Sequence, residues 1–193
     1  MELSLQKDVA PINSWQAHSS QFIVIYSDKR GAKYSIMIKV GDRIPETHLK
    51  TMIDAKVVDI NTTALFAHKK VVLFGVPGAF TPGCSKAHLP GYVQGHDAII
   101  ARGFDTIACV AVNDAWVMQA WGESANAIDK VLMLADGSAQ FAKMLGLSSD
   151  LTAAGMGIRF QRFSMIIEDG VVLELNVDGH YIQTTSADVT CGL

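Results

Sequence analysis

The chain has 193 residues, of which 49% are hydrophobic and 18% are charged, so it has enough apolar material to form a folded core. Sixteen basic and 19 acidic residues give a net charge of −3, which argues against nucleic acid or an anionic membrane surface as a main partner. No apolar run approaches the roughly 18–20 residues of a membrane-spanning helix. We therefore expect neither nucleic acid nor membrane as a partner, and one globular domain with at most an appendage.

The first 36 residues differ from the rest of the chain. They lack the basic start and apolar stretch of a secretory signal, and they lack the arginine-rich, acid-poor composition of a mitochondrial presequence. A domain-like pattern begins at Met37. We predict an extension of unknown role over residues 1–36 and a folded domain over residues 37–193. The predicted location is the cytoplasm, and organellar targeting by the extension stays open.

Three apolar runs predict strands that are buried on both faces, at residues 71–76, 104–112 and 131–134. A helical pattern lies between the first two runs, over residues 82–101, and its apolar positions recur at helical spacing. Pro90 lies within this pattern, so a kink is expected there.

Two further helices are predicted by their capping signals. Asn113 or Asp114 can cap a helix over residues 115–122. Ser138 can cap the next helix, which Gly146 would end.

The last part of the chain changes to a strand pattern. Apolar segments at residues 163–167 and 171–177 flank the dipeptide Asp169-Gly170, which is a strong signal for a β-hairpin. Alternating strands and helices followed by an antiparallel pair predict an α/β fold, with a mixed central β-sheet flanked by helices on both faces.

The most informative segment is residues 77–85, which reads PGAFTPGCS. A buried strand ends just before it, and Pro82 suits the first turn of a helix. Cys84 is therefore expected in that first turn, where free backbone N–H groups and the helix dipole favour the nucleophilic thiolate. Thr81 places a hydroxyl three residues earlier, and Pro77 can shape and shield the pocket. This arrangement favours chemistry at Cys84 over simple core packing.

The residues after Cys84 exclude two kinds of thiol site. Ala87 stands where a Cys-x-x-Cys oxidoreductase has its second cysteine, and His88 alone does not make a zinc site. His88 either polarises the pocket or packs there. The remaining possibility is a single activated thiolate that is oxidised and then rescued.

These residues resemble the peroxidatic motif of the peroxiredoxin family, with the greatest similarity to the branch of type II and atypical two-cysteine members. The resemblance covers about residues 37–190. It rests on the segment 77–85 and on four shorter matches: HLPG at 88–91, VND at 112–114, WG at 121–122 and RFSM at 162–165. The resemblance implies a thioredoxin-like fold and thiol-dependent reduction of hydrogen peroxide and alkyl hydroperoxides through a sulfenic acid on Cys84.

The family pattern also implies roles for individual residues. Cys84 resembles the peroxidatic cysteine, Thr81 its hydroxyl partner, Pro77 the pocket proline and Arg162 the activating arginine. Arg159 competes locally with Arg162 for that last role. The resemblance further implies a homodimer that meets near the active-site loop. We also expect no bound cofactor, and no metal, since no Cys or His pairs occur near Cys84 at the spacing of metal ligands.

The reduction of the sulfenic acid is the open step. Cys109 lies within the apolar strand at residues 104–112, a position typical of core packing, although plant type II relatives resemble its spacing from Cys84. Cys191 is third from the end and is expected on a flexible tail that could swing in. The loop where atypical two-cysteine members have a resolving cysteine, residues 179–186, contains none. We expect external rescue by glutathione, with glutaredoxin as partner; thioredoxin is the alternative donor.

Two other functions stay open from the sequence. One is a thiol–disulfide relay or redox sensor that uses the same cysteine. The other is a binding or chaperone-like domain that keeps the fold without the chemistry.

Overall fold

The computed structural model describes residues 25–27, 33–35, 37–179 and 181–193. Most of the predicted extension therefore lies outside the described residues, which within it form only an antiparallel pair, β1 (Ile25–Ser27) and β2 (Lys33–Ser35). None of the helices in the described part has the length and apolarity that crossing a bilayer requires.

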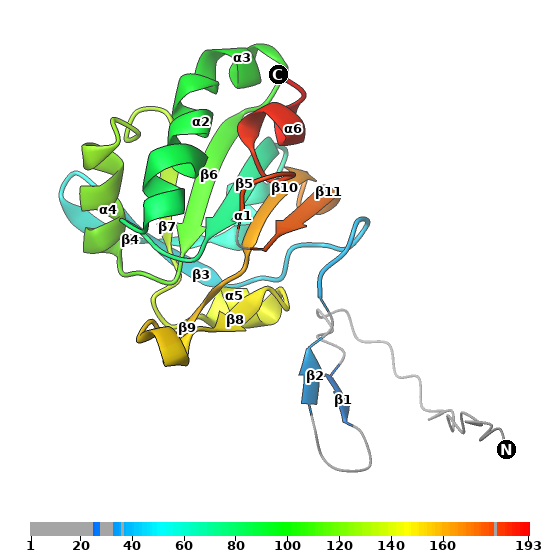
Figure 1. The fold of residues 1–193 in the computed structure, drawn as a ribbon. Coiled ribbons are helices and arrows are strands. Elements are labelled where there is room, and N and C mark those ends of the chain that lie inside the picture. The colour runs from blue at the N-terminus through cyan, green and yellow to red at the C-terminus, as the bar shows by residue number, and fades with distance from the viewer. Residues whose placement is uncertain (1–24, 28–32, 36, 180) are drawn as a thin grey trace, which may run out of the picture.

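A seven-stranded mixed sheet forms the centre of the domain (Figure 1). In spatial order its strands are β11 (Val171–Asp178), β10 (Arg162–Glu168), β5 (Lys70–Val76), β6 (Thr106–Ala111), β7 (Leu132–Ala135), β3 (His48–Ile53) and β4 (Lys56–Asn61). The three central strands, β5, β6 and β7, run parallel, and the strands on both sides pair antiparallel. The predicted mixed sheet is confirmed.

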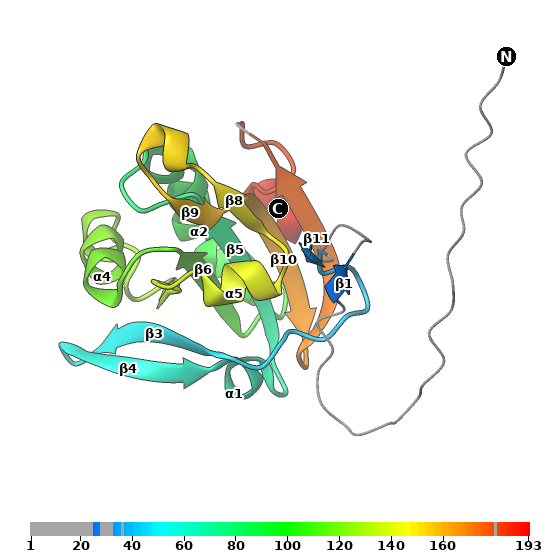
Figure 2. The same cartoon turned by 90° about the horizontal axis from the view of Figure 1, so that it is seen from below.

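Helices cover both faces of this sheet (Figures 1 and 2). One face packs against α2 (Leu89–Gln94), α3 (His96–Ala101), α4 (Ala115–Ser124) and α6 (Ala187–Cys191), and the other against α1 (Thr62–Phe66) and α5 (Gln140–Met144). Strand β5 needs cover on both faces because its apolar side chains alternate between them. Val72 and Phe74 belong to one apolar cluster, and Val71 and Leu73 belong to the other. A short pair, β8 (Ser148–Asp150) and β9 (Ile158–Phe160), and the 3-10 helix η2 (Thr152–Ala154) precede β10.

The predicted helix over residues 82–101 is present but is interrupted differently. It begins at Pro82, widens into a π-helix, η1 (Cys84–His88), continues as α2, and breaks at Gly95 before α3. The expected kink at Pro90 is replaced by the wider turn just before it, in which the Leu89 N–H donates to the Cys84 carbonyl. Because Pro90 has no N–H and its ring crowds the carbonyl four residues earlier, a wider turn relieves the conflict.

One predicted helix cap is confirmed and one is wrong. The Asp114 carboxylate accepts from the Val117 N–H at the start of α4, as expected. Helix α5 is not capped by Ser138. The Asp136 carboxylate accepts from the N–H groups of Gln140 and Ala142 instead, since two carboxylate oxygens can satisfy two donors of the first turn.

The predicted hairpin around Asp169-Gly170 joins β10 and β11, and both turn residues have positive φ, at 46° and 76°. A second hairpin, β3–β4, turns at Asp54 and Ala55, also with positive φ. This second turn contains neither Gly nor Asn, so its sequence carries little turn signal.

Candidate active site

Cys84 lies where the sequence places it, in the first helical turn after the carboxyl end of β5. The Ser85 N–H donates to the Thr81 carbonyl at 2.9 Å, which makes this the opening turn of the helix. The side chain of Ser85 accepts from the indole N–H of Trp121 at 3.0 Å, so α4 holds the turn in place. The Cys84 side chain is fully buried. Burial favours a small substrate over direct attack on a folded partner.

Arg162 is the arginine that reaches the sulfur. It is the first residue of β10, which pairs directly with β5, and its Nη2 lies 3.6 Å from Cys84 Sγ. The side chain is buried, and its Nε has no hydrogen-bond partner within the described part of the chain. A guanidinium held in this way places a fixed positive charge and free donor capacity beside the sulfur.

Arg159, the competing candidate, forms its hydrogen bonds with neighbouring loop residues instead of with Cys84. Its guanidinium donates to the carbonyls of Met156 and Val112 and lies 3.5 Å from the Asn113 side-chain oxygen. That same oxygen accepts from the Ala79 N–H at 3.0 Å. Arg159 and Asn113 therefore anchor the loop before Cys84, and sequence reasoning missed the role of Asn113.

Thr81 and Pro77 lie on the segment between β5 and Cys84. The Thr81 hydroxyl donates to the Gly78 carbonyl at 2.9 Å, which closes the turn before the helix. Both Thr81 and Pro77 are half-buried. Phe80, between them, has a φ of 60° and is 56% exposed.

His88, which the sequence left between two interpretations, is buried next to Arg162. Its Nδ1 lies 3.0 Å from Arg162 Nη1, and its Nε2 lies 2.8 Å from the Thr185 carbonyl oxygen. Burial, helped by the positive charge of Arg162, lowers the pKa of His88 to about 4. Because a carbonyl only accepts, Nε2 carries the proton of the neutral ring and Nδ1 accepts from Arg162.

The Thr185 carbonyl is positioned by a turn that the Asp178 carboxylate organises. This carboxylate accepts five hydrogen bonds, from the N–H groups of Gln183, Thr184 and Thr185 and from both threonine hydroxyls. Although burial raises it, these hydrogen bonds hold the pKa of Asp178 well below its ordinary value. The sequence alone does not reveal the role of this turn, because its Thr185 carbonyl accepts a hydrogen bond from His88, which lies almost 100 positions away.

The other two cysteines are free and buried. Cys109 lies in the middle of β6, as predicted, and burial raises the pKa of its thiol well above the ordinary value. The expected flexible tail around Cys191 is wrong. Cys191 ends helix α6, its carbonyl accepts from Arg102 at 2.8 Å, and burial together with the charge of Glu174 raises the pKa of its thiol to about 12.

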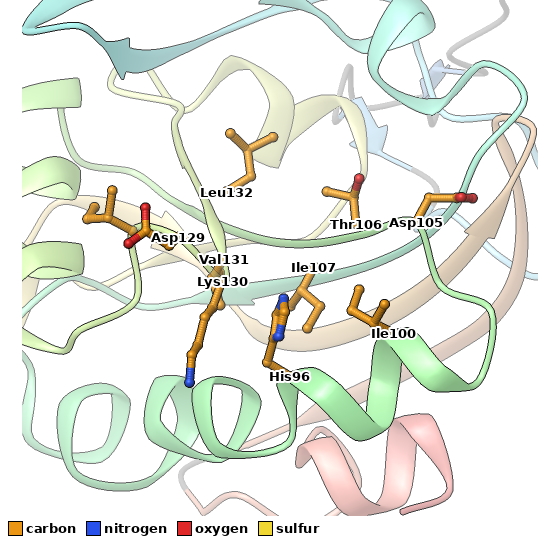
Figure 3. Close-up of a pocket in the computed structure, with 10 residues that line it drawn as sticks. His96, Ile100, Asp105, Thr106, Ile107, Asp129, Lys130, Val131 and Leu132 are labelled. Carbon is orange, nitrogen blue, oxygen red and sulfur yellow. The ribbon is translucent and has the colours of Figure 1, made fainter.

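The described structure also has a hollow of about 260 Å³ at the amino ends of β6 and β7 (Figure 3). His96, Asp105, Asp129 and Lys130 line it. It lies at the end of the parallel strands opposite to the one that Cys84 follows, so it is separate from the thiol site. Among the described residues, no group of three or more His, Cys, Asp or Glu side chains is arranged to hold a metal ion.

Comparisons with known proteins agree with this architecture. A family model described as Redoxin matches residues 39–189. Peroxiredoxin-2E, chloroplastic, from Arabidopsis thaliana is 40% identical over 159 residues, which is 79% of this chain and 68% of that protein. The structure of reduced Prx3 from Vibrio vulnificus, solved in complex with hydrogen peroxide, is 49% identical, with a TM-score of 0.78 over 81% of this chain and 98% of that one. The Plasmodium falciparum antioxidant protein, a 1-Cys peroxiredoxin, is 29% identical, with a TM-score of 0.73 over 79% of this chain and 96% of that one.

The mixed sheet with helices on both faces is thus the thioredoxin-like fold that the sequence resemblance implied. Extensive identity to named peroxiredoxins, over most of the chain, accompanies a buried cysteine at a helix start beside a buried arginine. The chain therefore belongs to the peroxiredoxin family and is a thiol-dependent peroxidase.

Proposed function

We propose that Cys84 is the peroxidatic cysteine and that Arg162, Thr81 and Pro77 form the rest of its site. The observation that carries this assignment is the 3.6 Å separation between Arg162 Nη2 and Cys84 Sγ, at the start of a helix. A guanidinium beside the sulfur and the positive end of the helix dipole both favour the thiolate, and they also stabilise the negative charge that develops on the leaving oxygen.

In the first step, the Cys84 thiolate attacks one oxygen of hydrogen peroxide or of an alkyl hydroperoxide. An S–O bond forms as the O–O bond breaks, and the leaving oxygen takes a proton to become water or an alcohol. The sulfur becomes a sulfenic acid. The Arg162 guanidinium, whose Nη2 lies 3.6 Å from the sulfur, can stabilise the negative charge that moves onto the peroxide oxygens.

Thr81 and Pro77 complete the site by position. The Thr81 hydroxyl, which lies just before the start of the helix, can accept a hydrogen bond from the peroxide while it donates to the Gly78 carbonyl. Pro77, which follows β5 directly, offers an apolar wall that limits the water around the sulfur.

The sulfenic acid is reduced by glutathione with glutaredoxin in this proposal. Glutathione displaces water from the sulfenic acid and forms a mixed disulfide on Cys84. A glutaredoxin thiolate attacks the glutathione sulfur, which releases the Cys84 thiolate and leaves glutaredoxin in a mixed disulfide with glutathione. A second glutathione then attacks that mixed disulfide, which regenerates the glutaredoxin thiol and releases oxidised glutathione. Cys109 and Cys191 are poor resolving groups because both are buried and both keep their protons, whereas the attacking species is a thiolate. The name of the 1-Cys relative supports the same conclusion.

Peroxide consumption by the wild type and by single Ser variants of the three cysteines tests this assignment. Each protein is supplied either with glutathione and glutaredoxin or with thioredoxin and its reductase. We expect Cys84→Ser to abolish turnover, whereas Cys109→Ser and Cys191→Ser stay within about threefold of the wild type with the glutathione system. Loss of turnover in either of the latter two would assign a resolving cysteine. Slow peroxide turnover with fast mixed-disulfide formation would identify a redox relay instead.

We also propose a homodimer that forms around the loop of Phe80. The support is an exposed aromatic pair, since Phe80 is 56% and Trp116 is 65% exposed, and the bond from Ala79 to Asn113 joins their two segments. By contrast, Trp121 and Phe141 are core residues. Light scattering of the wild type and of a double variant, Phe80→Ala with Trp116→Ala, tests this proposal: the wild type should be dimeric and the variant shifted towards monomer.

The compartment is a further proposal. The composition of residues 1–36 favours the cytoplasm, whereas one relative is named as chloroplastic. Imaging of fluorescent fusions with and without residues 1–36 distinguishes the two, because only a targeting segment would change the location when it is removed.

A further inference from the structure

Arg162 does not hold its position beside Cys84 alone. Its Nη1 donates to His88 Nδ1 at 3.0 Å while its Nη2 points to the sulfur. His88 lies one turn after Cys84 on the same helix and is buried. Phe74 from β5 and Tyr92 from α2 pack against the imidazole ring, with centroid separations of 5.1 and 5.7 Å. The ring therefore has a fixed place from which it can hold the guanidinium.

The acceptor at Nδ1 exists only because the other ring nitrogen carries the proton. The Thr185 carbonyl enforces this by accepting from His88 Nε2, and Asp178 holds Thr185 through its backbone N–H and its hydroxyl. A ring with the proton on Nδ1, or on both nitrogens, would turn a donor towards the guanidinium and push it away from the sulfur.

We propose that His88 is a positioning residue for the peroxidase reaction: in the tautomer set by the Thr185 carbonyl, it holds the Arg162 guanidinium against Cys84. This proposal rests on the proposed roles of Cys84 and Arg162. In addition, the position of the Arg162 guanidinium depends on the hydrogen bond that it donates to His88 Nδ1. The low pKa of His88 supports the proposal, because the ring stays neutral at pH 7.

Two substitutions of nearly equal shape separate positioning from packing. Asparagine at position 88 carries an oxygen close to the place of Nδ1 and can still accept from Arg162. Leucine has almost the same size and branching but offers no acceptor. Both variants lose the bond to the Thr185 carbonyl, which keeps the Tyr92 hydroxyl as a donor at 3.0 Å. The comparison of His88→Asn with His88→Leu therefore isolates the acceptor that faces Arg162.

We expect kcat/KM for hydrogen peroxide to fall about 100-fold in His88→Leu, as for a misplaced catalytic donor, and about tenfold or less in His88→Asn. The rate at which iodoacetamide alkylates Cys84 at neutral pH, followed by peptide mass spectrometry, should fall in the same order. Urea unfolding provides the control, because a packing role predicts that both measurements follow the loss of stability. His88→Met replaces the leucine variant if that protein does not fold, since it fills the site without a strong acceptor.

Equal kcat/KM values in His88→Asn and the apolar variant would overturn the proposal and leave His88 as a core residue. The Cys84→Ser protein distinguishes this result from failure of the proposed function. If Cys84→Ser is inactive while the two His88 variants are equal, only the positioning role is wrong. If Cys84→Ser keeps peroxidase activity, the site assignment itself is wrong.

Discussion

Acidification is expected to destabilise the folded domain because His88 is buried in its neutral form. The unfolded chain takes up a proton at this residue near the ordinary pKa of 6.5, whereas the folded protein does so only near 4. Arg162, from β10, adds to the cost of a second positive charge, and the Asp178 carboxylate at the end of β11 partly offsets it. Between these two pH values the unfolded state binds more protons, so the free energy of unfolding falls as the pH falls.

The size of the effect follows from the two pKa values. At about 1.4 kcal/mol for each pH unit, the interval from 6.5 to about 4 corresponds to about 3 kcal/mol. This is a large part of the roughly 5–15 kcal/mol by which a domain is usually stable. The full stability is present above pH 6.5, and the loss is complete once the pH is below the folded-state pKa.

Urea unfolding of the wild type and of His88→Asn, at several pH values from about 7 to about 4.5, measures this contribution. The fluorescence of the buried Trp121 reports the transition. The variant keeps every other titrating group, so the difference between the two proteins isolates residue 88. The wild type should lose about 2–3 kcal/mol more than the variant over this range. Parallel pH dependence in the two proteins would refute the assignment of a buried neutral histidine.

Three further predictions follow from other contacts. Gly75→Ala should lower the free energy of unfolding by roughly 3 kcal/mol in thermal or urea unfolding, because an added Cβ would lie 1.9 Å from the buried Phe163 ring; an unchanged midpoint would show that the ring moves freely. Arg162→Lys should reduce kcat/KM by about 100-fold in a peroxide assay, since an ammonium cannot reach the sulfur and His88 together; activity within threefold would contradict that role. Asp178→Asn should destabilise the protein by about 2–4 kcal/mol and lower kcat/KM, because one amide oxygen cannot accept five hydrogen bonds. A loss of stability in urea unfolding with an unchanged kcat/KM would show that this turn does not influence the active site.

Local signals were sufficient where the structure is local. The turn after β5, the helix start at Pro82 and the hairpin at Asp169-Gly170 lie where their residue types predict them, since proline and glycine restrict or free the backbone directly. The second hairpin, at Asp54 and Ala55, was not found because its turn residues reach positive φ without glycine or asparagine.

In the candidate site too, some residues could be predicted from local sequence and others could not. Cys84 and Thr81 could be identified from one nine-residue segment, because a helix start after a buried strand is a short-range feature. Arg162 needed the resemblance, since nothing near it in the sequence distinguishes it from Arg159. Only the pairing of β10 with β5 brings its guanidinium to the sulfur and leaves Arg159 on the loop.

The sequence by itself determined the class of fold, the position of the thiol and the chemistry that a thiol in that position can perform. The tertiary structure alone decided which cation faces the sulfur, which ring nitrogen holds that cation, and that the last cysteine lies in a packed helix instead of a free tail. The reason is physical. Backbone conformation and capping depend on neighbours a few residues away, whereas a buried charge is placed by side chains that meet across 70 to 100 positions of sequence once the sheet and its helices have packed.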